Sequence, residues 1–170
     1  LRELSKYAGI IVPGGFGETG IDGKLRVIRF AREHKIPYLG LCYGMQLALV
    51  EYARNVLRLK GAHTTEIEAA AKDPVIAVMP EQKKKIEKEE YGGTMRLGVY
   101  PAYLKKGTIA RSAYGKEIVE ERHRHRYEVN PEYIERLVKG GVVFSGVSPD
   151  RILMEIAELP KAKHPFFLGT

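Results

Sequence analysis

The only cysteine among the 170 residues, Cys42, lies in the stretch GLCYG (40–44). An apolar run typical of a buried strand (36–41) precedes it, and a segment with helical spacing (45–57) follows it. The flanking glycines allow a sharp turn because they carry no side chain at the bend. A thiol at such a strand–turn–helix elbow is expected to act as a nucleophile, since the positive end of the helix lowers its pKa. The alternative is a small buried hydrophobe.

A glycine-rich loop, PGGFGETG (13–20), follows a second apolar run, AGIIVPGG (8–15). The loop lacks the Lys-Ser/Thr pair of a phosphate-binding loop and the full Gly-x-Gly-x-x-Gly spacing, so its pattern is weak evidence for a nucleotide. The backbone N–H groups of such a loop can instead stabilise a developing oxyanion. The nucleophile elbow one strand later favours this second interpretation.

The elements that must position these groups follow the order strand, loop, helix, strand, turn, helix, which predicts a parallel βαβ unit and one α/β domain over residues 1–170. The predicted helices span 22–34, 45–57 and 131–141. The predicted strands span 8–15, 36–41, 74–79, 92–100, 126–130, 141–148, 152–158 and 165–170. The charged stretch 81–90 is predicted as a solvated loop or hairpin tip.

The formal net charge is +7 and the pI is near 9.4. Nucleic-acid binding could cause this excess of basic residues, but they are interleaved with acidic ones, as in EQKKKIEKEE (81–90). We therefore favour a Lys- and Glu-rich surface of the kind common in heat-adapted proteins, with no nucleic-acid partner. One cysteine excludes an internal disulfide and fits a reducing cytosol. Since no apolar stretch approaches the roughly 20 residues of a bilayer span and no secretory signal is present, we expect a cytoplasmic protein without a membrane partner.

Four segments resemble the glutamine amidotransferase domain of CTP synthases, a class I glutaminase with a cysteine nucleophile. The elbow alone indicates only the wider class I superfamily, whereas GGTMRLG and ERHRHRYEVN are similar to the CTP synthase branch. The four segments are VPGGFGETGIDGK (12–24), PYLGLCYGMQLALVEYAR (37–54), GGTMRLG (92–98) and ERHRHRYEVN (121–130). The resemblance implies a flavodoxin-like, mostly parallel sheet flanked by helices, with an added antiparallel segment.

The resemblance also implies the chemistry. Cys42 would attack the carboxamide of L-glutamine, form a glutamyl thioester and release ammonia for the ATP-dependent conversion of UTP to CTP. The backbone N–H groups of Gly15 and Tyr43 would hold the oxyanion. Glu66 would hold the α-amino group and Arg126 the α-carboxylate, a natural use of a guanidinium fork. The complete set of substrate-binding residues implied by the resemblance is Gly14, Gln46, Glu66, Arg126 and Tyr127.

No metal and no cofactor is implied for this domain, because ATP and Mg²⁺ belong to the synthetase domain of the family. That synthetase domain is the expected partner and is absent from this sequence. Whether the chain forms a homo-oligomer is left open. Tyr43 stands where a leucine is expected after the cysteine, a mild departure because the backbone acts there.

The ends of the chain depart from the family pattern. The family completes its triad with a His-Pro-Glu motif after the strand that matches HPFFLGT (164–170), and this sequence stops at Thr170. Its first predicted strand also begins as early as residue 8, so the first elements of the family's fold are expected to be absent. We therefore expect a glutaminase domain truncated at both ends that is weakly active or inactive alone. The five histidines are expected to be structural or surface residues rather than the base: His34, His63, His123, His125 and His164.

Three other functions stay open. One is another class I glutaminase, such as that of GMP synthesis, against which ERHRHRYEVN argues. The second is a non-catalytic remnant of the fold, and the third is a hydrolase with its own acid or histidine beside Cys42. Strand alternation places Arg122, Arg124 and Arg126 on one face and two histidines on the other. The arginines could form an exposed basic face or a phosphate site, but the resemblance favours the border of the glutamine site.

Overall fold

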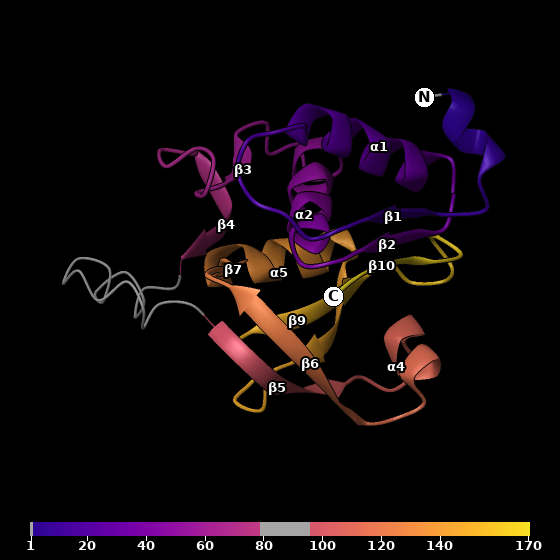
Figure 1. Ribbon diagram of the computed structural model, residues 1–170, viewed down its shortest axis with the longest axis vertical. Helices are drawn as coiled ribbons and strands as arrows, with labels where there is room; N and C mark the ends of the chain where they lie inside the picture. Colours follow the sequence, from indigo (N-terminus) through magenta and orange to yellow (C-terminus); the bar gives the residue numbers. More distant parts are fainter. Residues whose placement is uncertain (1, 79–95) are drawn as a thin grey trace.

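The computed structural model describes residues 2–78 and 96–170 (Figure 1). Within them, seven strands form one sheet in the order β1-β2-β10-β9-β8-β5-β6, and three form a second in the order β3-β4-β7. The larger sheet contains β1 (Ile10–Val12), β2 (Tyr38–Gly40), β5 (Arg96–Leu104), β6 (Ile118–His125), β8 (Val143–Val147), β9 (Met154–Glu158) and β10 (Phe167–Gly169). The smaller sheet contains β3 (Ala62–Thr64), β4 (Asp73–Val78) and β7 (Tyr127–Val129).

The three helices expected from apolar spacing are confirmed. The helices of the described residues are the 3-10 helix η1 (Arg2–Lys6), α1 (Ile21–Glu33), α2 (Tyr43–Asn55), α4 (Ile109–Tyr114) and α5 (Pro131–Gly140). Leu25, Ile28 and Ala31 are buried at the predicted spacing on α1. Helix α5 begins after Asn130, whose side chain accepts a hydrogen bond from a backbone N–H, and ends at Gly141 with a φ of 105°. No helix of this part of the chain is long and apolar enough to cross a membrane.

The larger sheet combines two kinds of pairing. Strands β1, β2 and β10 are parallel, as the βαβ order predicts. The pairings from β10 through β9, β8 and β5 to β6 are antiparallel. The α/β class is therefore confirmed, and the antiparallel part is larger than the sequence suggested. In Figure 1, the long strand pair of β5 and β6 extends away from the helices α1 and α2.

Some boundaries differ from those predicted. The strand expected over 92–100 is described only from Arg96 onward, as β5, and the loop expected over 81–90 lies outside the described residues. Strand β3 and helix α4 were not predicted, because three and six residues are too few to show a hydrophobic period. The first four residues of RHRHR (122–126) belong to an eight-residue strand, β6, which ends at His125.

The parallel strands bring two loops and the residue Thr170 to one edge of the sheet. Val12 and Gly169 are the register partners of Gly40, so β1, β2 and β10 end side by side. Chain segments that leave the carboxyl ends of parallel strands meet there, which is where α/β proteins bind ligands. The glycine-rich loop, the cysteine elbow and Thr170 follow these three ends directly.

Candidate active site

Cys42 lies in a strained elbow between β2 and α2. Its φ of 49° and ψ of −101° fall in a region that residues with a side chain rarely adopt, and such strain is typical of functional sites. A Cβ at position 44 would lie 2.2 Å from the carbonyl oxygen of Val12, and one at position 40 would lie 2.7 Å from the carbonyl carbon of Gly44. Both glycines are thus required by close approach, and the predicted elbow is confirmed.

The glycine-rich loop lies beside the elbow. A Cβ at Gly14 would be 3.8 Å from the Cβ of Cys42, which places the loop backbone next to the thiol. Among residues 2–78 and 96–170, nothing accepts a hydrogen bond from the backbone N–H of Gly15. The backbone N–H of Tyr43 forms a hydrogen bond with the Cys42 sulfur. The loop and the elbow therefore present backbone donors near the thiol, as an oxyanion site requires.

A cleft of about 580 Å³ opens over Cys42. It is lined by Gly14, Gly15, Phe16, Cys42, Gln46, Glu66, Arg124, His125, Arg126 and Tyr127. Every residue predicted for the site lines this cleft except Tyr43, whose side chain is only 1% exposed beneath it. The fold thus brings together residues from positions 14 to 127, although their individual roles stay predictions.

Gln46 connects the elbow helix to the smaller sheet. It lies one helical turn after Cys42, is 5% exposed, and donates a hydrogen bond from its amide nitrogen to the carbonyl oxygen of Tyr127 at 3.0 Å. That bond fixes the amide orientation, so its Oε1 atom remains as an acceptor. A residue held this way can orient a substrate in the cleft.

Glu66 and Arg126 place one charge of each sign in the cleft. Glu66 accepts a hydrogen bond from the backbone N–H of Gly17 at 3.0 Å. Arg126 forms no ion pair within the described residues, and its buried Nε atom has no hydrogen-bond partner there. Buried guanidinium nitrogens normally have partners, so an unpaired one in a cleft is a site for an anionic group. A free α-amino acid carries one charge of each sign and matches this pair.

The pKa of the Cys42 thiol is raised, contrary to the lowering predicted from the helix N-terminus. Burial is the largest cause, and the negative charges of Glu128 and Glu66 act in the same direction. The hydrogen bond from the Tyr43 N–H lowers the pKa but is outweighed. Because the thiol stays protonated at neutral pH, a base must remove its proton before it attacks.

A buried polar network, not anticipated from the sequence, lies beneath the cleft. Arg96 donates two hydrogen bonds to Glu155, at 2.9 and 3.1 Å, and one to Glu128 at 3.2 Å. All three residues are at most 9% exposed. Burial raises the pKa of Glu128 to about 7, although the charge of Arg96 acts against this rise. The network therefore has two carboxyl groups around one cation.

Two histidines connect this network to the site. Nδ1 of His125 lies 3.1 Å from the carbonyl oxygen of Tyr127, and its Nε2 lies 2.8 Å from Nδ1 of His123. Since the carbonyl oxygen can only accept, His125 donates to it from Nδ1. The Nε2 atom of neutral His125 is then an acceptor, so His123 donates to that atom from its own Nδ1. Burial, followed by the charges of His123 and Arg96, lowers the pKa of His125 to about 4, so this histidine is neutral. The Tyr127 carbonyl oxygen thus accepts hydrogen bonds from both Gln46 and His125.

A sequence signal for this network existed but was incomplete. Alternation predicted that the histidines of RHRHR face away from the arginines, and Arg122 and Arg124 are exposed while His123 and His125 are half-buried. Their partners Arg96, Glu128 and Glu155 come from β5, β7 and β9, which the sequence does not pair. A charged residue inside an apolar strand, as in MEIAE (154–158), is the signal that could have identified Glu155.

None of the histidines in the described part of the chain forms a hydrogen bond with Cys42. His164 is 1% exposed and its Nε2 lies 3.1 Å from the carbonyl oxygen of Ala31 on α1, away from the thiol. His63 contacts a neighbouring backbone N–H, and His34 stacks on Phe30. These positions agree with the prediction that these histidines are structural.

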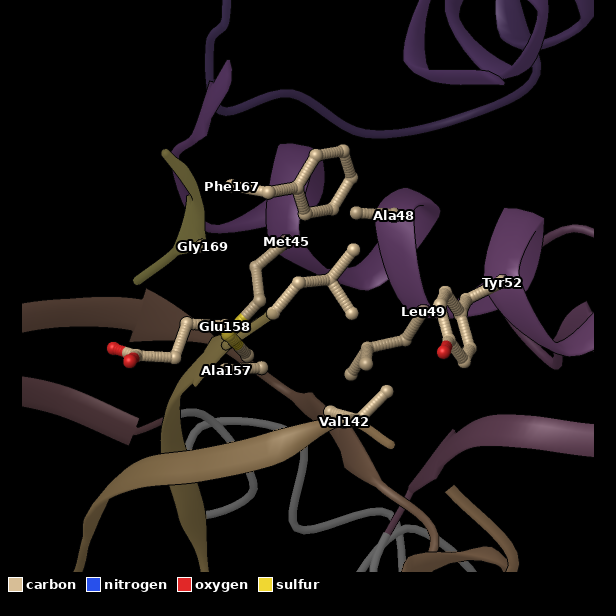
Figure 2. A pocket seen from close by; sticks show the side chains of 10 residues that line it. Met45, Ala48, Leu49, Tyr52, Val142, Ala157, Glu158, Phe167 and Gly169 are labelled. Atoms are coloured by element: carbon tan, nitrogen blue, oxygen red, sulfur yellow. The ribbon is translucent and has the colours of Figure 1, made fainter. Parts of the chain in front are cut away.

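A small apolar cavity lies away from the site, beside α2. Its volume is about 20 Å³, close to that of one water molecule, and Figure 2 shows apolar side chains of α2, β9 and β10 around it. The carboxylate of Glu158 points away from this cavity and accepts hydrogen bonds from the backbone N–H groups of Ile109 and Ala110. The cavity is a packing gap. Among the described residues, no group of three or more His, Cys, Asp and Glu side chains could hold a metal ion.

Comparison with known proteins agrees with this geometry. The family model of glutamine amidotransferase class-I matches residues 1–169. The CTP synthase of Pyrococcus furiosus is 57% identical over 168 residues, and that of Shouchella clausii is 56% identical over 167 residues. Both alignments cover 98% of this chain, and the chain spans 30% of the length of these curated relatives.

Solved structures point the same way. The glutaminase domain of Trypanosoma brucei CTPS, with bound acivicin, matches with a TM-score of 0.89 and 37% identity, over 99% of this chain and 64% of that one. A glutamine amidotransferase of Methylobacillus flagellatus matches with a TM-score of 0.56 and 16% identity, over 94% of this chain and 50% of that one. The second likeness concerns the fold alone.

Proposed function

The chain belongs to the class I glutamine amidotransferase family, and from this premise we propose that it hydrolyses L-glutamine to glutamate and ammonia. The observation that carries the proposal is the cleft that joins the strained Cys42 elbow with Glu66 and the unpaired Arg126. A nucleophile and two opposite charges are what a hydrolase of a free amino-acid amide needs.

Substrate recognition uses the ends of the amino acid. The carboxylate of Glu66 holds the α-ammonium group, and the guanidinium of Arg126 holds the α-carboxylate. Gln46 and the backbone of Gly14 and Tyr127 border the side chain between them. This arrangement directs the carboxamide toward Cys42.

The covalent step forms a bond between the Cys42 sulfur and the carboxamide carbon. The carbonyl oxygen becomes an oxyanion, which the N–H groups of Gly15 and Tyr43 stabilise. Collapse of this intermediate breaks the C–N bond and releases ammonia, which takes up the proton that the thiol has lost. Water then hydrolyses the thioester to glutamate and the free thiol. The base for the thiol proton is not found among the histidines of the described residues.

The ammonia has a proposed destination. The curated relatives are CTP synthases, and the Trypanosoma brucei neighbour is a glutaminase domain of such an enzyme. We propose that ammonia from this domain supplies the ATP-dependent amination of UTP to CTP by a synthetase domain, which would bind ATP and Mg²⁺. That residues 1–170 form one glutaminase domain, and that the protein is cytoplasmic, both remain predictions.

A second candidate, a non-catalytic member of the fold, is supported by the raised pKa of the Cys42 thiol and by the lack of a histidine bonded to this thiol within residues 2–78 and 96–170. The two proposals differ in whether the cleft binds glutamine. Calorimetric titration of L-glutamine into a Cys42→Ala variant, which binds without turnover, decides between them. We expect saturable binding that falls at least tenfold with either Glu66→Gln or Arg126→Gln and is unchanged by Arg122→Gln on the neighbouring exposed face. Absence of saturable binding, or equal binding by all variants, would favour the non-catalytic protein.

A further inference from the structure

The side chain of Tyr43 ties the glycine-rich loop to the elbow helix. Its hydroxyl donates a hydrogen bond to the carbonyl oxygen of Gly17 at 2.8 Å. Within the loop 13–20, Gly17 alone is half-buried and the other residues are exposed, so this bond is at the point where the loop contacts the body of the protein. The Tyr43 side chain itself is 1% exposed.

Gly17 is held on both sides. Its carbonyl accepts from Tyr43, while its N–H donates to Glu66 at 3.0 Å. Lys24 adds a weaker contact, because its Nζ atom lies 3.4 Å from the carbonyl oxygen of Thr19 and 5.2 Å from the centre of the Tyr43 ring. Burial, together with the charge of Glu66, raises the pKa of Tyr43 to about 12, so the hydroxyl remains a donor at neutral pH.

The same ring also packs under the oxyanion segment of the loop. A Cβ at Gly15 would lie 3.5 Å from Cδ1 of Tyr43. Thus the backbone N–H of Tyr43 contacts the Cys42 sulfur, while its side chain contacts the loop that carries the Gly15 N–H. One residue connects both proposed oxyanion donors.

We infer that Tyr43 is a positioning residue, whose hydroxyl holds the loop backbone in place so that the Gly15 N–H stays aligned with the reacting carbonyl. This role rests on the proposed function, in which the α-ammonium group of glutamine binds Glu66. When substrate engages Glu66, the Gly17 N–H shares or loses its acceptor. The bond from Tyr43 is then the remaining side-chain anchor of Gly17.

The test compares two tyrosine variants on the same helix. Tyr43→Phe removes the bond to the loop, and Tyr52→Phe removes a hydrogen bond of equal length, 2.8 Å, to the carbonyl oxygen of Gly140, far from the cleft. The probe is a diazo-ketone analogue of L-glutamine, whose carbonyl takes the place of the carboxamide. Adduct formation on the full chain is followed by mass against analogue concentration, giving a saturating rate constant and a half-saturating concentration. Iodoacetamide reports thiol access separately.

For Tyr43→Phe we expect the saturating rate constant to fall about three- to tenfold, the loss of one neutral hydrogen bond. The half-saturating concentration and the iodoacetamide rate should stay within about twofold of the original chain, and Tyr52→Phe should match the original in all three. Equal rate constants for Tyr43→Phe and the original chain would overturn the positioning role alone. If the original chain formed no adduct while iodoacetamide still reacted, the proposed function would fail, and this role with it.

Discussion

Replacing Arg96 by methionine should destabilise the protein strongly, because it leaves two buried carboxyl groups without their cation. Glu128 and Glu155 are 4% and 5% exposed, and both accept hydrogen bonds from Arg96. Removal of one partner of a buried ion pair typically costs about 3–5 kcal/mol. Arg96→Met should lower the free energy of unfolding by an amount in that range at pH 8.

The loss of stability in Arg96→Met should grow as the pH rises above about 7. Glu128 has a folded pKa of about 7 against an ordinary value of 4.5, so its contribution to stability is present at low pH and is lost as pH rises through about 7. Without Arg96 the pKa of Glu128 should rise further, and the folded variant then keeps a proton that the original chain releases. The gap between the two proteins should therefore widen above pH 7 by up to about 1.4 kcal/mol per pH unit.

Urea unfolding followed by circular dichroism at pH 6, 7, 8 and 9 measures this gap. Arg29→Met is the matched control, since Arg29 pairs with Glu33 on the surface of α1 with 54% and 41% of the side chains exposed. Such a pair is worth about 0.3–0.5 kcal/mol. A loss below about 1 kcal/mol for Arg96→Met, or a gap that stays constant from pH 6 to 9, would refute the reasoning.

Three further outcomes follow from the geometry of the elbow and its surroundings. The iodoacetamide rate of Cys42 should keep rising with pH beyond 9.0, the ordinary pKa of a thiol, and a plateau below pH 8.5 would contradict the raised pKa. Glu128→Gln should shift that profile to lower pH, because the charge of Glu128 helps raise the pKa of the thiol; a shift to higher pH would contradict this cause. Gly44→Ala should lower the free energy of unfolding in urea by more than about 3 kcal/mol, because the added Cβ would collide with the Val12 carbonyl oxygen. Gly23→Ala, which has open space around it in α1, should raise the free energy of unfolding by up to about 1 kcal/mol. Equal effects of the two substitutions would contradict the packing argument.

The sequence predicted the elements whose evidence is local. Helices α1, α2 and α5 show apolar spacing, α5 also ends at a glycine, and the elbow is visible in five consecutive residues. The strand order of the larger sheet was harder to predict from the sequence. Strand β10 lies between β2 and β9, although it is more than 120 residues from β2 in the chain. In the antiparallel half of this sheet only the pairing of β5 with β8 joins strands far apart in the chain, because β8, β9 and β10 follow one another directly and only α4 lies between β5 and β6.

The candidate site divides in the same way. The residues that line the cleft could be named because motif resemblance carries long-range information that periodicity lacks. The direction of the Cys42 pKa was predicted wrongly, because the helix terminus is a local feature, whereas burial and the charge of Glu128 come from the tertiary fold. The role of the Tyr43 side chain was missed for a similar reason, since its acceptor is a backbone carbonyl 26 residues away.

The most direct test of the account is the mass and site of the adduct that a diazo-ketone analogue of L-glutamine forms on this chain. Cys42 is the only cysteine, so peptide mapping is unambiguous. The account predicts one adduct on Cys42 that excess L-glutamine prevents, that Arg126→Gln abolishes and that Arg124→Gln, in the same cleft, leaves in place. An adduct that forms equally with Arg126→Gln, or a free thiol that only iodoacetamide modifies, would contradict the glutamine site.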